Sequence, residues 1–389
     1  MPNTSQQAPQ VSAAQVNRAQ RFAVLNSAVE MIQQIYSAVI NPASQTVINI
    51  APRNVGLVKR FIVVISGTAN NTDATNAANL SDFGLSNLLS QVVFQDLNNN
   101  TRIQTTGWHL ALLSAIKHQF PNASALLNAA LNAGSVFGNN FGVIVAPTGF
   151  AYATSQPFQM VFEIPLAYSD EDLRGSVYMN VVNAVANLQL TLNSSPFAAS
   201  GVDSTSAVWK GAAGNISNVT VTVFQEYLDQ LPVTKNGVVL PALDLATVYE
   251  IKNTTFSAIV ANNDFPIPYA NFRDFLSTFL IYNHDPSADA GRVGGTDVNY
   301  LALQSANFTN LFKIPPSIAA YRARRVLKAD LPLGAYYFSN RRKPLSTQTY
   351  GNMELILNPL TAASGAYALV GWEDFALVNV LTQAGSLAG

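Results

Sequence analysis

Short runs of alternating apolar and polar residues recur along most of the chain. Residues 187–193 read NLQLTLN, which places Leu188, Leu190 and Leu192 on one face and polar side chains on the other. Residues 218–228 alternate valine with threonine in the same way. Because successive side chains of a strand point to opposite faces, this period of two predicts strands. Further strands are predicted at 45–50 and 56–67, separated by clusters of Asn, Gly, Pro and Ser.

Part of this pattern occurs twice. NLQLTLN at 187–193 returns as NMELILN at 352–358, and two weaker matches stand in the same order: TVINI (46–50) with TVYEI (247–251), and PLAY (165–168) with PLGAYY (332–337). Three matches in one order predict a duplicated β-domain, with Leu190 and Leu355 in matching core positions. Each half holds enough strands for an antiparallel jelly roll of about eight strands. The predicted fold class is therefore mainly β, with two tandem jelly rolls.

The join between the halves is predicted near residues 228–245, where Pro232, Asn236-Gly237 and Pro241 interrupt the pattern. We expect an N-terminal arm and helix over 1–41, a first jelly roll over 42–240, and a second over 241–389 that ends in a C-terminal arm. Short helices in the loops are predicted at 107–119, 170–182, 296–306 and 317–330. The third of these begins a few residues after the turn that holds His284.

The opening stretch, residues 15–41, is predicted to form one amphipathic helix that ends at Asn41-Pro42. It carries two arginines at its N-terminal end and a broad apolar stripe, namely Arg18, Arg21, Phe22, Leu25, Val29, Ile32, Tyr36 and Val39. Such a helix can lie beneath its own domains, between subunits, or at the surface of a bilayer. Because it precedes the first predicted strand, we expect it to be dispensable for folding.

Composition points to a protein that packs against copies of itself. The 389 residues are 49% hydrophobic but only 11% charged, where about 25% is usual. The cores of protein interfaces are poor in charge, because an unpaired buried charge is costly. The chain has no cysteine and a net charge of -1, so neither thiol chemistry nor a general attraction to nucleic acid is expected. Without a recognisable signal peptide, assembly in the cytoplasm is expected.

Candidate chemistry is sparse. His109, His118 and His284 lack the spacing of a metal site, and no phosphate-binding loop or nucleophile elbow is present. We expect no enzyme activity, no metal and no cofactor. The basic clusters at 321–328 and 340–344 could contact lipid or phosphate, or pair with acidic residues of a neighbour. The alternative function is a lectin-like, carbohydrate-binding jelly roll.

The chain closely resembles the major capsid proteins of tectiviruses, tailless icosahedral phages with an internal membrane. The resemblance covers nearly the whole chain, except 118–160 and the end after about 360, and rests on NVGLVK (54–59), LSDFGLSNLLSQV (80–92), TGWHL (106–110), PLAYSDEDLRG (165–175), YLDQLPVTKNGVVLPALDLATVY (227–249), GTDVNYL (295–301) and YGN (350–352). It implies homotrimers that form pseudo-hexagonal capsomers and tile an icosahedral shell over the membrane. The implied partners are neighbouring trimers, minor capsid and vertex proteins and the internal lipid, with no specific nucleic acid, and the implied location is the virion capsid.

Overall fold

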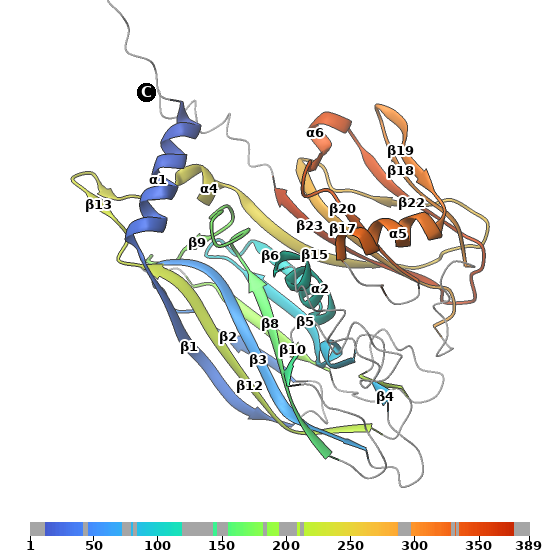
Figure 1. Cartoon of the computed structure of the whole chain (residues 1–389), viewed down its shortest axis with the longest axis horizontal. Helices are drawn as coiled ribbons and strands as arrows, with labels where there is room; N and C mark the ends of the chain where they lie inside the picture. The colour runs from blue at the N-terminus through green and yellow to red at the C-terminus, as the bar shows by residue number, and fades with distance from the viewer. Residues whose placement is uncertain are drawn as a thin grey trace, which may run out of the picture.

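The computed structural model describes residues 12–41, 46–71, 79–80, 84–118, 143–145, 155–181, 185–193, 208–210, 214–286, 297–327, 331 and 334–376. Over these residues the chain is mainly β and forms two jelly rolls. Figure 1 shows them side by side, the first in blue to green and the second in orange and red. The predicted fold class is confirmed.

The first roll consists of two facing sheets. One sheet has the order β1-β12-β3-β8-β7, with β9 beside β3, and the other runs β2-β10-β5-β6. The strands are β1 (Val29–Ile40), β2 (Val47–Ile50), β3 (Leu57–Asn71), β5 (Leu89–Gln95), β6 (Thr101–Thr105), β7 (Val143–Val145), β8 (Ser155–Pro165), β9 (Val177–Tyr178), β10 (Asn187–Leu192) and β12 (Gly214–Asp229).

The second roll repeats this arrangement. Its sheets have the orders β15-β23-β17-β20, with β21 beside β17, and β16-β22-β18-β19. The strands are β15 (Val248–Phe256), β16 (Phe265–Pro268), β17 (Arg273–Asn283), β18 (Val298–Ser305), β19 (Phe308–Ile314), β20 (Ala335–Ser339), β21 (Leu345–Ser346), β22 (Met353–Pro359) and β23 (Tyr367–Ala376). Two short ribbons pair β4 (Asn79–Leu80) with β11 (Trp209–Lys210) and β13 (Val233–Thr234) with β14 (Gly237–Val238).

The predicted equivalence of NLQLTLN and NMELILN is confirmed. These segments are β10 and β22, the second strand from the edge in the second sheet of each roll. Leu190 pairs with Ile48 and Val92, while Leu355 pairs with Ile267 and Leu303. Both leucines are fully buried. They therefore hold matching positions in two separate cores.

The other two sequence matches are wrong as markers of the repeat. TVINI contains β2, the second strand of the first roll, whereas TVYEI contains the start of β15, the first strand of the second roll. PLAY follows the end of β8, whereas PLGAYY runs into the start of β20. Short apolar runs with a β-branched residue suit any strand, so such matches can arise without a shared position.

The predicted helix over 15–41 is half wrong. Helix α1 (Ala13–Ser27) ends at Ser27, Ala28 already has an extended backbone, and β1 follows at once. Strand β1 pairs antiparallel with β12 from Val29 to Ile40. Valine and isoleucine are frequent from 29 to 40 and favour strands. Pairing with the edge of β12 therefore stabilises the extended conformation more than the helical spacing of the apolar residues stabilises a helix. Residues 29–40 thus belong to the first roll, and a chain that starts at Pro42 lacks a strand.

Two of the four predicted loop helices are confirmed, as α2 (Gly107–His118) and α5 (Pro316–Leu327). The patch at 296–306 instead contains β18, whose residues pair with strands on both sides. The patch at 170–182 is a series of turns with the short β9, because its acidic residues pair with arginine and lysine, as described below. Short elements complete the described fold: η1 (Gly84–Leu88), α4 (Ala242–Ala246) and α6 (Thr347–Tyr350). None of the described helices has the length and apolar character to cross a membrane.

Candidate assembly surfaces

Helix α1 is fixed to the rest of the chain through one buried carboxylate, that of Asp244 on α4. Arg21 donates to both of its oxygens at 2.5 Å, and the Asn17 amide donates to one of them at 2.8 Å. Ser12 and Gln15 close a capping box at the start of α1. Asp244 is only 2% exposed, so these charge-assisted bonds hold the helix in one place. In Figure 1, α1 lies with α4 and the β13 ribbon at the upper end of the first roll, here called the α1 end.

The eight residues predicted as one stripe divide between α1 and β1. On α1, Arg18 is exposed, Phe22 is 70% exposed, and Leu25 packs against a small cluster around buried Val24. Arg21 pairs with Asp244 and also lies 3.4 Å from Asp172. On β1, Val29, Ile32 and Val39 are exposed at 43%, 60% and 78%, whereas Tyr36 packs against the core of the first roll. The apolar surface of this region therefore belongs mostly to an edge strand.

A cluster of ion pairs covers the outer face of the sheet that contains β1. Lys59 and Arg60 on β3 are shared among four carboxylates, those of Glu30, Glu163, Asp170 and Glu226. Lys59 is only 3% exposed on its side chain, whereas Glu30 and Asp170 are more than half exposed. Four acids against two bases leave this surface acidic. The acidic run 169–173 thus pairs with bases across the sheet and does not cap a helix.

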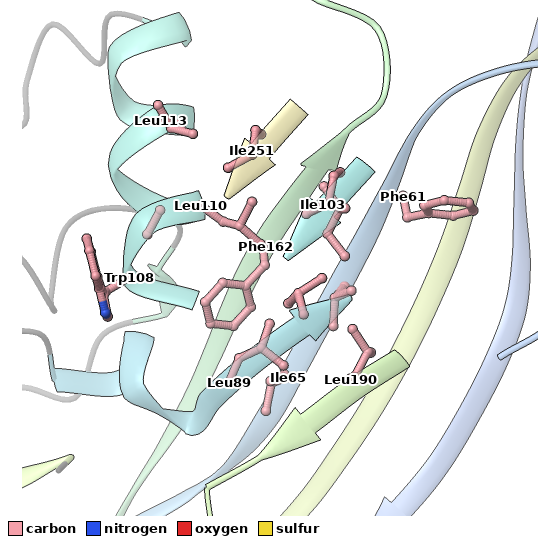
Figure 2. Close-up of a cluster of buried hydrophobic side chains, with 14 of the residues drawn as sticks. Phe61, Ile65, Leu89, Ile103, Trp108, Leu110, Leu113, Phe162, Leu190 and Ile251 are labelled. Carbon is pink, nitrogen blue, oxygen red and sulfur yellow. The ribbon is translucent and has the colours of Figure 1, made fainter. Parts of the chain in front are cut away.

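The two rolls are joined through a continuous sheet. Strand β6 of the first roll pairs in parallel with β15 of the second, with Ile103 opposite Ile251 and Gln104 opposite Lys252. Ile251 is fully buried and belongs to the core of the first roll. Figure 2 shows it between Ile103 and Leu110, beside Phe162. Side chains of the second roll, Ile251 among them, thereby complete the core of the first.

Helix α2 lies in the junction between the rolls. It packs on β8 and β5 of its own roll, and on its other side the ring of Trp108 lies 4.9 Å from that of Phe279 on β17. The His109 ring is so close to Gly371 on β23 that a Cβ there would lie 2.6 Å from it. His109 is bonded to Thr105 at 2.8 Å, and burial lowers its pKa to about 4. A neutral, fully buried histidine therefore acts here as a packing residue.

Buried charges also meet in this junction. Glu373 on β23 accepts hydrogen bonds from Tyr249, Ser277 and Arg341 at 2.6–2.8 Å. Burial alone would raise its pKa, but the positive charges of Arg341 and Lys117 hold the pKa below its ordinary value. Lys117 of α2 lies 4.6 Å from the centre of the Tyr249 ring, and burial lowers its pKa to about 8. Of the basic cluster 340–344, Arg341 is thus used within the chain, while Arg342 and Lys343 are exposed.

Helix α5, unlike α2 in the junction, is mostly exposed. Its narrow buried side consists of Pro316, Ala319 and Ala323, and its remaining surface is exposed. That surface combines apolar side chains with arginines, namely Ile318, Tyr321, Arg322, Arg324, Arg325 and Val326. An exposed surface of this mixed kind is typical of a contact with another molecule.

Neither the junction nor its buried charges could be predicted from the local sequence pattern. The one available signal was the pair Glu373-Asp374 inside the apolar run 366–378, where strand-like spacing requires that an acid be buried. Among the described residues no group of three His, Cys, Asp or Glu side chains could hold a metal ion. The His118 side chain and most of 118–160 lie outside the described residues. His284 lies 3.5 Å from Asp297.

Comparison with known proteins identifies relatives over nearly the whole chain. The family model for the N-terminal part of the P3 major capsid protein matches residues 3–231, and that for its C-terminal part matches 246–389. The major capsid protein P3 of Enterobacteria phage PRD1 is 36% identical over 373 residues, which are 95% of this chain and 93% of that protein. These relatives confirm the resemblance to tectivirus capsid proteins and give the lectin alternative no support.

Solved structures share the fold at much lower sequence identity. A chain in the atomic structure of Sulfolobus Turreted Icosahedral Virus has a TM-score of 0.61 at 12% identity, over 92% of this chain and 93% of that one. The major capsid protein of Faustovirus has a TM-score of 0.54 at 9% identity, over 90% of this chain and 91% of that one. These likenesses support the double jelly-roll fold alone.

Proposed function

The chain belongs to the P3 major capsid protein family, and from this premise we propose that three copies close into a ring of six jelly rolls. Such a homotrimer is a pseudo-hexagonal capsomer, a block that can tile an icosahedral shell. The observation that carries the proposal is the β6–β15 joint, which binds two equivalent rolls into one rigid unit with a shared core. Three such units supply six nearly equivalent sides. The chain's role in the virion is structural.

The mass of the particle in solution tests this proposal. Size-exclusion chromatography with light scattering should give three times 41.7 kDa at micromolar concentration, because an obligate interface of this kind buries more than about 2,000 Å². A folded particle with the mass of one chain would refute the trimer. Negative-stain images should show a three-fold particle with a hexagonal outline.

We also propose that the α1 end faces the internal membrane. Three apolar side chains that are about 70% exposed lie at or near this end: Phe22 on α1, Val233 on β13 and Phe272. Phe272 is placed there because the next residue, Arg273, pairs with Ala376, which pairs with Val248 just after α4. Figure 1 places α6 at the same end, and the exposed Arg342 and Lys343 lie a few residues before α6 in the chain. Aromatic rings at the level of the headgroups, with basic residues beside them, suit an anionic lipid surface.

Flotation with vesicles tests the membrane contact. The trimer should float with vesicles that contain anionic lipid at low salt, and a Phe22→Ser, Phe272→Ser variant should float much less. The matched control is Val260→Ser, which removes a similarly exposed apolar side chain from the loop between β15 and β16. Equal flotation of both variants would place the lipid contact elsewhere or refute it.

Further partners and locations follow from the capsid role. We propose that neighbouring trimers, minor capsid proteins and vertex proteins bind around the capsomer, and that assembly takes place in the host cytoplasm. We also propose a division of the chain at residue 240, since the two family models meet between residues 231 and 246. Whether vertex proteins co-purify with assembled particles would test the proposal that they bind around the capsomer.

A further inference from the structure

The joint between the two rolls has an open counterpart at the outer edge of each roll. Within the chain, β6, at the edge of one sheet of the first roll, pairs with β15, at the edge of one sheet of the second roll. Helix α2, which follows β6, then packs on the sheet that contains β15. In the second roll, the strand that corresponds to β6 is β19, and α5 follows it. In the first roll, the strand that corresponds to β15 is β1. Among the described residues, β1 and β19 each stand at the edge of a sheet.

A β-bulge at the same place in both rolls fixes the residue-by-residue equivalence of β1 and β15. In the first roll, β3 skips Lys59, so that Arg60 faces Glu226 on β12. In the second roll, β17 skips Leu276, so that Ser277 faces Glu373 on β23. The residue opposite Glu226 on β1 is Ile32, and the residue opposite Glu373 on β15 is Ile251. Ile32 is therefore the counterpart of Ile251, and Gln33 the counterpart of Lys252.

Two counts align β19 with β6, and they differ by two residues. Through the sheet, from Leu190 and Leu355 by way of Val92 and Leu303, Phe312 corresponds to Thr105. We use the count from the helices, because the helix that follows the strand covers the joint. Helix α2 begins at Gly107, two residues after β6 ends, and α5 begins at Pro316, two residues after β19 ends. Counted back from the helix starts, Phe312 corresponds to Ile103 and Lys313 to Gln104. The burial agrees, because Ile103 and Phe312 both pack against the core of their own roll, while Gln104 and Lys313 are exposed.

Burial distinguishes the closed joint from its open counterpart. Ile251 is fully buried under α2, whereas its counterpart Ile32 is 60% exposed. All residues of β17 from Phe275 to Asn283 are buried, but on β3 the residues between Arg60 and Ile65 alternate between buried and half-buried. Helix α2 is buried from Gly107 to Leu113 and half-buried at the described positions beyond, whereas α5 is buried on one narrow side. Each open element thus lacks the cover that its counterpart receives within the chain.

The two open surfaces also have complementary charge. Residues 316–327 of α5 contain three arginines and no acid. The outer face of the β1 sheet carries four carboxylates against Lys59 and Arg60. In the closed joint, a cation of the helix, Lys117, lies near the counterpart carboxylate of Glu373. The arginines of α5 can therefore pair with the carboxylates of the acidic face, as the positive charge of Lys117 interacts with Glu373.

We propose that the occupant of this surface is a second copy of the chain. Strand β19 of one copy pairs in parallel with β1 of the next, with Phe312 opposite Ile32 and Lys313 opposite Gln33, and α5 covers the acidic outer face of β12 and β3. The Ile32 side chain lies against the second roll of the neighbour, as Ile251 lies against the first roll within the chain, with Ala319 at the position of Leu110. This proposal rests on the trimer proposed above and names the contact that closes it.

Engineered cysteines test the register directly, because the natural chain has none. Gln33→Cys and Lys313→Cys in one chain should form disulfides between copies under mild oxidation, giving covalent dimers and trimers on a denaturing gel. A disulfide needs Cα atoms within about 7 Å. The positive control is Gln104→Cys with Lys252→Cys, which should close within one chain. The register control is Gln33→Cys with Asn310→Cys, where a shift of three residues moves the thiols roughly 10 Å apart, and no cross-linked ladder is expected.

The outcomes separate this contact from the trimer itself. A ladder with the first pair and none with the register control supports the contact. A particle of trimer mass without a ladder would overturn the contact and leave the trimer standing. A folded particle of single-chain mass without a ladder would overturn both. As a second variant, Ile32→Arg should shift the mass from three chains toward one, while Val260→Arg should leave it unchanged; equal behaviour of the two would count against the contact.

Discussion

Glu226 and Glu373 occupy the same position in the two rolls, each opposite the residue that follows a β-bulge on the adjacent strand. Glu373 is fully buried under the neighbouring roll and is satisfied by Tyr249, Ser277 and Arg341. Glu226 lies on the outer face of the chain and is paired with Lys59 and Arg60. One fold position thus serves an internal joint in one roll and an open surface in the other.

Gly371→Ala should loosen the joint between the rolls. The added Cβ would lie 2.6 Å from the His109 ring, and overpacking of this kind costs about 1–3 kcal/mol. Denaturant unfolding would measure the loss. In a His109→Ala background the same substitution should cost much less, because the ring is gone; an undiminished cost would mean that the strain lies elsewhere.

The buried His109 should make stability depend on pH. Its pKa is about 4 in the folded chain and about 6.5 when unfolded. Between these values the unfolded chain binds a proton that the folded chain does not, so the contribution of His109 falls as pH falls from 6.5 to 4, by at most about 3 kcal/mol. Asp374, with its pKa raised by burial to about 7, works in the opposite direction over much of this range.

A comparison of His109→Gln with the natural chain isolates this contribution. Asp374 is present in both proteins and its effect cancels. The stability deficit of the variant at pH 7 should shrink as the pH approaches 4, as read from urea unfolding at several pH values. A deficit that does not change with pH would show that the histidine is not held neutral.

Asp244→Ala should release helix α1 without unfolding the rolls. The substitution removes the partner of Arg21 and Asn17, and hydrogen bonds to charged groups contribute roughly 1.5–3 kcal/mol. Hydrogen exchange should rise over residues 13–27 and stay low in β3 and β12. Arg18→Ala, on an exposed position of the same helix, is the control and should change exchange little. Protection of α1 in the Asp244 variant would contradict the anchoring role.

Two truncations should behave differently. A chain that begins at Val29 keeps β1 and should still form the first roll, although it lacks α1. A chain that begins at Pro42 loses the strand that pairs with β12 along its length, so it should aggregate or melt at a much lower temperature. Thermal melting of both chains would decide the point, and equal melting would show that β1 contributes little to the fold.

The sequence was sufficient for features that depend on local pattern. Alternation identified β10 and β12, and the recurrence of NLQLTLN as NMELILN identified one true pair of equivalent strands. It failed at 29–40, where VEMIQQIYSAVI fits a helix and a strand equally well and only pairing with β12 decides. The Glu226–Glu373 equivalence could not be found from the sequence, because it depends on two bulges that appear only when strands are in register.

An image of the assembled trimer at a resolution that shows side chains would reveal the contact between copies directly. We predict six rolls joined by one repeated contact: β6 with β15 inside each chain, and β19 with β1 between chains, with Ile32 of one copy beside Phe312 of the next. A three-fold particle in which Ile32 and the outer side of α5 face solvent would contradict it.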